Sequence, residues 1–225
     1  MTERERLDDL QYKERRIIQD IDTYCFAADA VCLARFATYR KQDRVLELGT
    51  GTGVIPLLMA DEVAKVDALE LNTRLVNLAT RNVTLNNLAD KITVRQGDLR
   101  QISELYPAAC FDLVLANPPY YPLGQGKVSA NPLVAAAKHE VTATLDEVIG
   151  AARYALKPNG RIAMVHRTLR LTEVFMAWQK AGITPKRLQL VQDNNHTPPA
   201  IFLLEGTVGG GKGLKILPTL FLSNI

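Results

Sequence analysis

The stretch VLELGTGTGVIPLL, residues 45–58, decides the fold of this chain. An apolar run interrupted only by Glu47 leads to three glycines, Gly49, Gly51 and Gly53, and a second apolar run follows them. Glycine allows a tight backbone turn and lets a ligand approach the main chain. The pattern therefore predicts a buried β-strand that turns sharply into a helix, with a binding site at the turn.

Strands and helices alternate through the rest of the chain. Further strands are expected at residues 65–72, 91–98, 111–117, 160–166, 183–192 and 200–208, and helices at 54–63, 72–86, 142–156 and 169–181. Strands that are apolar nearly throughout are typical of a parallel sheet covered on both faces. The last two strands have no helix between them. We therefore predict an α/β, Rossmann-like fold with a seven-stranded, mostly parallel sheet, helices on both faces and a C-terminal antiparallel hairpin.

The two ends of the chain are less regular. Residues 1–40 are expected to form an extension that packs on a single domain at 41–225, and they include a helix at 26–36. A small basic cluster, Lys13, Arg15 and Arg16, is either a solvated face or a contact for phosphates. The apolar tail, residues 216–222, is expected to pack on the domain or on a partner subunit.

Composition excludes several classes of protein. The 225 residues are 47% hydrophobic, which is enough for one core, and the net charge of +3 permits a nucleic-acid partner without requiring one. No stretch is apolar over the length of a membrane span, and the N-terminus lacks a signal-peptide pattern. Three scattered cysteines, Cys25, Cys32 and Cys110, predict no metal and no disulfide framework, and they favour a cytoplasmic protein.

Acidic side chains follow three of the predicted strands. Glu47 precedes the glycine turn, Glu70 ends the second strand, and Asp98 follows the third. The carboxyl ends of parallel strands meet at one edge of the sheet, where ligands bind. A dinucleotide fingerprint would need glycine where Val54 stands, and a carboxylate at Glu47 would repel a pyrophosphate. The acids instead suit a ligand that carries positive charge.

The fourth strand delivers Asn117-Pro118-Pro119-Tyr120 to the same edge. The Asn117 side-chain carbonyl and the Pro118 backbone carbonyl can each accept a hydrogen bond from a planar NH2 group, and proline fixes φ so that the acceptors are preorganised. Tyr120 can stack on a planar target. Such a site would catalyse mainly by positioning and electrostatics. Alone, the motif is better explained as a proline-rich turn than as a catalytic segment. As a catalytic segment, its target could be adenine in DNA or RNA, or glutamine in protein.

The acid before G-x-G-x-G resembles motif I of class I S-adenosylmethionine-dependent methyltransferases. With "FAADAVCLARFA", "ANPPYY" and the "KHE" segment at 138–140, nearly the whole chain resembles the bacterial tRNA1(Val) (adenine-37-N6)-methyltransferase family. This resemblance implies S-adenosyl-L-methionine as cofactor, S-adenosyl-L-homocysteine as product, and an adenine in tRNA or other structured RNA as target. It implies a cofactor site of Phe26, Asp29, Glu47, Gly49, Thr50, Gly51, Gly53, Glu70, Asp98, Leu99 and Asn117. It also implies catalytic roles for Asn117, Pro118, Pro119 and Tyr120, and substrate contacts from Tyr120, Tyr121, Lys138 and His139.

Other functions stay open at this point. A protein glutamine methyltransferase usually has a sizeable N-terminal helical domain, whereas only about 40 residues precede the glycine turn here. A DNA adenine methyltransferase would usually have a separate target-recognition domain. A non-catalytic protein that binds the cofactor and RNA would not need the intact Asn-Pro-Pro-Tyr motif. We expect a monomer or weak homodimer with no membrane association.

Overall fold

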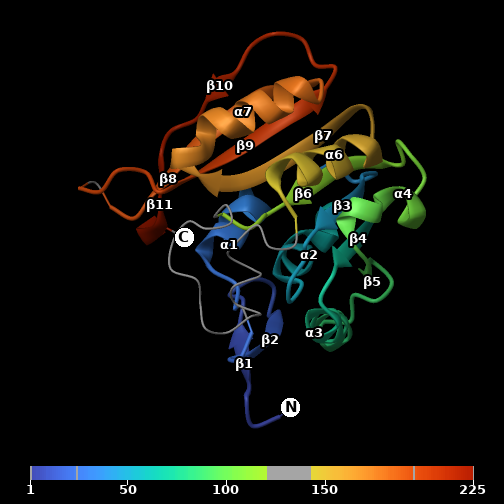
Figure 1. The fold of residues 1–225 in the computed structure, drawn as a ribbon. Coiled ribbons are helices and arrows are strands. Elements are labelled where there is room, and N and C mark those ends of the chain that lie inside the picture. Colours follow the sequence, from blue (N-terminus) through green and yellow to red (C-terminus); the bar gives the residue numbers. More distant parts are fainter. Residues whose placement is uncertain (1, 24, 121–142, 195, 225) are drawn as a thin grey trace.

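The computed structural model describes residues 2–23, 25–120, 143–194 and 196–224. Its central sheet has the order β10-β8-β9-β7-β6-β3-β4-β5, and β11 pairs with the C-terminal end of β8 (Figure 1). The seven long strands are β3 (Arg44–Leu48), β4 (Lys65–Glu70), β5 (Ile92–Gln96), β6 (Phe111–Ala116), β7 (Leu156–Arg167), β8 (Ile183–Gln192) and β9 (Ile201–Val208). Strands β3 to β7 are parallel, and β9 runs antiparallel to both β7 and β8. The predicted fold, including the terminal hairpin, is confirmed.

Helices cover both faces of this sheet. They are α1 (Ala28–Phe36), α2 (Val54–Met59), α3 (Thr73–Leu85), α4 (Ile102–Leu105), α6 (Leu145–Ala155) and α7 (Leu171–Lys180), with 3-10 turns η1 (Ala60–Glu62), η2 (Leu99–Gln101), η3 (Thr168–Arg170) and η4 (Leu222–Asn224). The side chains of β6 alternate between two cores. Leu113 and Leu115 pack with α1 and α2, whereas Val114 and Ala116 pack with α6 and α7. This two-sided burial explains the unbroken apolar run of β6.

The C-terminal tail folds back on its own domain. Two short strands, β10 (Lys215–Ile216) and β11 (Leu220–Phe221), pair in parallel with β8, and Leu217, Leu220 and Leu222 pack against the first core. Ahead of the tail, Gly206 is required by close packing, because a Cβ there would lie 2.6 Å from the Trp178 ring. None of the helices in the described part of the chain is long and apolar enough to cross a membrane.

A β-hairpin at the N-terminus was not predicted from the sequence. It consists of β1 (Glu5–Asp9) and β2 (Arg16–Asp20), paired antiparallel as a separate sheet (Figure 1). Helix α3 and its C-cap residue bind β2 through two asparagines one turn apart. Asn82 accepts from Ile18 N at 2.6 Å and donates to Ile18 O at 3.0 Å, and Asn86 bonds the N–H and C=O of Arg16 at 3.0 and 2.7 Å. Four helical residues rise about as far as two strand residues, so the two side-chain amides reach the backbone of β2 at Arg16 and Ile18. They pair with that backbone as a neighbouring strand would.

We expect Asn82→Ala to destabilise the protein by about 2–4 kcal/mol, because Asn82 is fully buried and its loss leaves buried backbone groups unpaired. Asn82 also donates to Thr52 O at 2.9 Å, so it ties the hairpin to the glycine turn. Asn86→Ala is the matched control, and its half-buried site should limit the loss to about 1 kcal/mol because water can replace the amide. Urea unfolding measures both changes, and equal losses would contradict this account.

The basic cluster is largely committed to the protein itself. Arg15 is buried, donates to Leu57 O and forms an ion pair with Asp61 at 2.7 Å; Lys13 pairs with the same carboxylate at 2.7 Å. Lys13 and Arg16 are exposed, and Arg15 alone of the three is buried. Lys13 and Arg15 therefore anchor the hairpin turn to Asp61 of η1, and the phosphate-contact interpretation is not favoured for the buried Arg15.

Candidate active site

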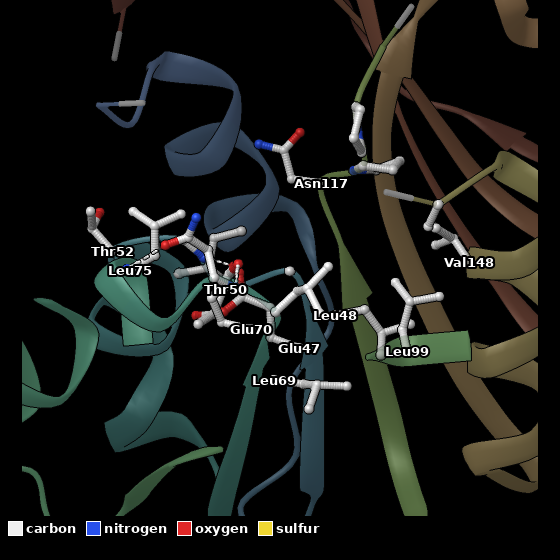
Figure 2. A pocket seen from close by; sticks show the side chains of 18 of the residues that line it. Glu47, Leu48, Thr50, Thr52, Leu69, Glu70, Leu75, Leu99, Asn117 and Val148 are labelled. Atoms are coloured by element: carbon white, nitrogen blue, oxygen red, sulfur yellow. Dashed lines mark hydrogen bonds between the residues drawn. The ribbon is translucent and has the colours of Figure 1, made fainter. Parts of the chain in front are cut away.

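A cavity of about 460 Å³ opens at the carboxyl ends of β3, β4 and β6 (Figure 2). The structure brings most of the predicted cofactor residues together in its wall. These are Phe26, Glu47, Gly49, Thr50, Gly51, Glu70, Asp98, Leu99 and Asn117. Pro118 and Pro119 also line it, whereas Gly53 and Asp29 lie outside the wall. Tyr121, Lys138 and His139 fall outside the described residues.

The glycine turn forms the floor next to α2. Gly49, Gly51 and Gly53 have φ values of +75°, +58° and +86°, in the left-handed region that favours glycine. A Cβ at Gly49 or Gly51 would meet nothing within 4 Å, so the space above this backbone is open. Gly53 instead lies against α3, where its Cβ would be 3.4 Å from that of Ala79. Leu69 O fixes the turn by accepting from Gly49 N and Thr50 N at 2.9 and 3.0 Å.

Two buried carboxylates lie side by side at this turn (Figure 2). Glu47 accepts from the Thr50 hydroxyl, and burial raises the pKa of Glu47 to about 8, with a smaller contribution from the nearby Glu70. Glu70 accepts from Gly51 N and Asn72 N, each at 2.9 Å, and burial raises its pKa as well. Burial therefore makes the charged forms of both carboxylates unfavourable. A cation bound in the cavity would offset that cost.

Asp98 and a set of apolar side chains form a further part of the wall. Asp98 caps η2 by accepting from Arg100 N at 2.9 Å, and the hydrogen bonds and charge of the Arg100 side chain hold the pKa of Asp98 below its usual range. Leu99 and Val148 lie across the cavity from the two glutamates (Figure 2). Sequence reasoning missed Val148, Leu75 and Ala30, which line the cavity, because apolar residues on amphipathic helices look the same whether they face a core or a ligand.

The pKa of Glu47 predicts a pH dependence of stability. An acid whose folded pKa lies above its unfolded value holds a proton in the folded state at pH values where the unfolded chain has lost it. The ligand-free protein should therefore lose stability as pH rises from about 5 to 8, by at most about 1.4 kcal/mol per pH unit from this group. Glu47→Gln, which mimics the protonated acid, should remove that part of the slope. Parallel curves for the two proteins in urea unfolding would show the prediction to be wrong.

The Asn-Pro-Pro-Tyr segment follows β6 directly. Asn117 projects from the strand end over the cavity (Figure 2), and the Tyr120 hydroxyl lies 2.9 Å from Asn117 Oδ1 and bonds Asp29 on α1. The centroid of the Tyr120 ring lies 5.4 Å from that of His166, the fully buried next-to-last residue of β7. Burial lowers the pKa of His166 to about 3, and its Nδ1 accepts from Arg167 N at 2.8 Å, so the ring is neutral. His166 therefore packs against the Tyr120 ring as a neutral side chain.

The charged, apolar and backbone groups that line the cavity define the kind of ligand that fits. Carboxylates face one side of the cavity, apolar side chains face the other, and the backbone N–H groups of the turn are already engaged with Leu69 O and Glu70. Such a cavity suits a cation with hydroxyl groups and an apolar planar part, and not a phosphate. Among the described residues, no three or more His, Cys, Asp or Glu side chains gather as a metal site.

Comparison with known proteins agrees with this geometry. Residues 27–179 match the family model described as "Methyltransferase small domain", and a tRNA1(Val) (adenine(37)-N6)-methyltransferase of Pasteurella multocida is 33% identical over 72% of this chain and 73% of its own length. The chain belongs to this methyltransferase family. The Photobacterium profundum protein of the same name is 26% identical over 80% of this chain and 76% of its own.

The fold of this methyltransferase is shared with solved structures. A predicted O-methyltransferase from Agrobacterium tumefaciens superposes with a TM-score of 0.68 at 18% identity, covering 86% of this chain and 87% of that one. The likeness concerns the class I methyltransferase fold alone. S-adenosyl-L-methionine is the cofactor of such enzymes, and the two buried carboxylates with no phosphate cradle fit its cationic, phosphate-free structure.

Proposed function

We propose that this enzyme methylates the exocyclic N6 of an adenine in tRNA, next to the anticodon. The observation that carries the proposal is the position of Asn117, Pro118 and Pro119, which open onto the same cavity as Glu47 and Glu70. A carboxylate-lined cofactor site and a pair of amide-type acceptors thus share one cavity. S-adenosyl-L-methionine supplies an electrophilic methyl group on a sulfonium when it is bound there.

Each wall of the cavity has a proposed role in holding the cofactor. Glu70, at the end of β4, accepts hydrogen bonds from the ribose hydroxyls, and Glu47 provides the negative charge that favours a cationic ligand. Asp98 accepts from the adenine amino group. Phe26, Leu99 and Val148 contact the apolar part of the ligand. The glycine turn, with Thr50, lets the ligand approach the main chain.

The substrate amine is held by acceptors and needs no general base. The Asn117 side-chain carbonyl and the Pro118 carbonyl accept from the two N–H bonds of N6, which directs the nitrogen lone pair away from the ring plane. The N6 proton becomes acidic only as nitrogen gains positive charge, so it can leave to water after methyl transfer. The rate enhancement then comes from orientation and preorganised electrostatics.

The choice of tRNA rests on the relatives. Both curated proteins reported above are named for adenine 37 of tRNA1(Val). An adenine in a structured loop must be turned out of its stack to reach a cavity of this kind. Tyr120, together with Tyr121, Lys138 and His139, is the proposed contact for the base and its neighbours. The reaction would take place in the cytoplasm, and the enzyme is proposed to act as a monomer or weak homodimer.

Label transfer from S-adenosyl-L-methionine separates the candidate functions. The enzyme is incubated with labelled cofactor, total tRNA and ribosome-free protein extract from a strain that lacks its gene. We expect label in the tRNA fraction, recovered as N6-methyladenosine. Label in protein instead, on a glutamine side chain, would replace this proposal by the glutamine reaction. Tight cofactor binding with no label in either fraction would favour a non-catalytic binding protein.

A further inference from the structure

Three side chains form a hydrogen-bonded chain that leads from helix α1 into the cavity. Asp29 is buried on α1. Its carboxylate accepts a hydrogen bond from the hydroxyl of Tyr120, which lies 91 residues later in the sequence. The same hydroxyl lies 2.9 Å from Oδ1 of Asn117, which lines the cavity. Asp29 itself does not line it. A charged residue outside the cavity thus contacts, through one hydroxyl, the amide proposed to hold the substrate.

The positions of the atoms decide where the hydroxyl proton goes. Asp29 Oδ1 accepts from Ala30 N at 2.7 Å, and Oδ2 faces Tyr120. A phenol has one proton to donate, and a carboxylate is a stronger acceptor than an amide oxygen. The proton therefore points to Asp29, and the Tyr120 oxygen presents lone pairs to Asn117. Those lone pairs are met best by the NH2 group of Asn117. In the structure Oδ1 occupies that position, so the preferred arrangement is reached by a half-turn of the amide.

We propose that Asp29 is a positioning residue, which acts through the Tyr120 hydroxyl to turn the Asn117 amide so that its oxygen faces the substrate amine. A half-turn of the amide exchanges oxygen and nitrogen at nearly the same positions, and hydrogen-bond partners select between the two. The inference rests on the proposed function, because a substrate NH2 needs an acceptor at Asn117. The packing of the Tyr120 ring on His166 keeps the hydroxyl between its two partners.

Asp29→Asn is the most direct test because it keeps the shape and reverses the polarity. Its Oδ1 can still accept from Ala30 N, which leaves NH2 facing the Tyr120 oxygen. The hydroxyl must then donate to Asn117, and the amide presents the wrong group to the substrate. We expect kcat for tRNA methylation to fall about tenfold to a hundredfold. Cofactor affinity, measured by calorimetry, should stay within about twofold because Asp29 is not in the cavity wall.

A double-mutant cycle shows whether Asp29 acts through Tyr120. Tyr120→Phe removes the hydroxyl and should lower kcat by itself, but in that background Asp29→Asn should change kcat by less than about twofold. Tyr39→Phe is the matched control. It removes another hydroxyl bonded to α1, at 2.7 Å from Ala34 O, away from Asn117, and should leave kcat unchanged.

The outcomes separate this inference from the proposed function. A wild-type enzyme that forms N6-methyladenosine, with an Asp29→Asn variant of unchanged kcat, would overturn the inference alone. Losses in kcat that multiply in the cycle would show that Asp29 acts independently of Tyr120 and would overturn the inference. A loss confined to cofactor affinity would also overturn it and would assign Asp29 to cofactor binding. A wild-type enzyme that forms no N6-methyladenosine would overturn the proposed function and this inference with it.

Discussion

Asn117→Ala is expected to reduce kcat for tRNA methylation by about a hundredfold to a thousandfold, the usual effect of removing one preorganised hydrogen-bonding group from a reaction site. Alanine removes the acceptor that β6 holds at the cavity edge, and the Pro118 carbonyl alone cannot fix the orientation of the amine. Cofactor affinity should change by no more than about threefold, because Glu47 and Glu70 remain in place. Single-turnover kinetics with saturating tRNA measures the chemical step.

Asn86→Ala provides a control for the loss of an asparagine side chain. Asn86 bonds the backbone of Arg16 on the N-terminal hairpin and is not in the cavity wall, so its variant should keep wild-type turnover. If Asn117→Ala weakened cofactor binding strongly while its single-turnover rate stayed normal, Asn117 would belong to the cofactor site and not to the substrate site.

Glu70→Ala is expected to weaken S-adenosyl-L-methionine binding by about a hundredfold, or ~3 kcal/mol, because hydrogen bonds to a charged group are among the strongest in proteins. The carboxylate has two tasks in the structure. It lies in the cavity wall, and it fixes the glycine turn through Gly51 N and the next turn through Asn72 N. Calorimetry at neutral pH gives the dissociation constant.

Stability should respond to Glu70→Ala much less than affinity does. Burial raises the pKa of Glu70, so the charged form is unfavourable in the ligand-free protein and its removal offsets the lost backbone hydrogen bonds. Glu104→Ala removes an exposed acid on α4 and is the matched control for both measurements. A Glu70→Ala protein that unfolds more easily but binds cofactor normally would contradict the proposed ribose contact.

The sheet and most of the cavity wall could be predicted because their signals are local. A glycine turn, an acid at a strand end and an Asn-Pro-Pro-Tyr segment are each contained in a few residues, and the topology rule for parallel strands brings them to one edge. The observed ends of the predicted helices and strands differ from the expected ends by only a few residues. The helix expected at 142–156 is α6, Leu145–Ala155, which begins at a capping box formed by Thr144 and Glu147.

The N-terminal hairpin could not be predicted in the same way. The sequence of β1, ERLDD, has little apolar alternation, and the partners of β2 are side chains on a helix 64 or more residues away. The pairing of Asp29 with Tyr120 is equally remote in sequence, so the resemblance suggested a cofactor contact, whereas the structure places Asp29 on the tyrosine hydroxyl. The division of the chain at residue 40 stays a prediction.

Analysis of the modified tRNA tests the central claim most directly. Total tRNA from a strain without the gene is treated with the enzyme and S-adenosyl-L-methionine, digested to fragments and nucleosides, and analysed by mass spectrometry. The account predicts one methyl group, on N6 of the adenosine next to the anticodon, that does not form with the Asn117→Ala enzyme. A methyl group on any other atom, or no new methylation in tRNA, would contradict it.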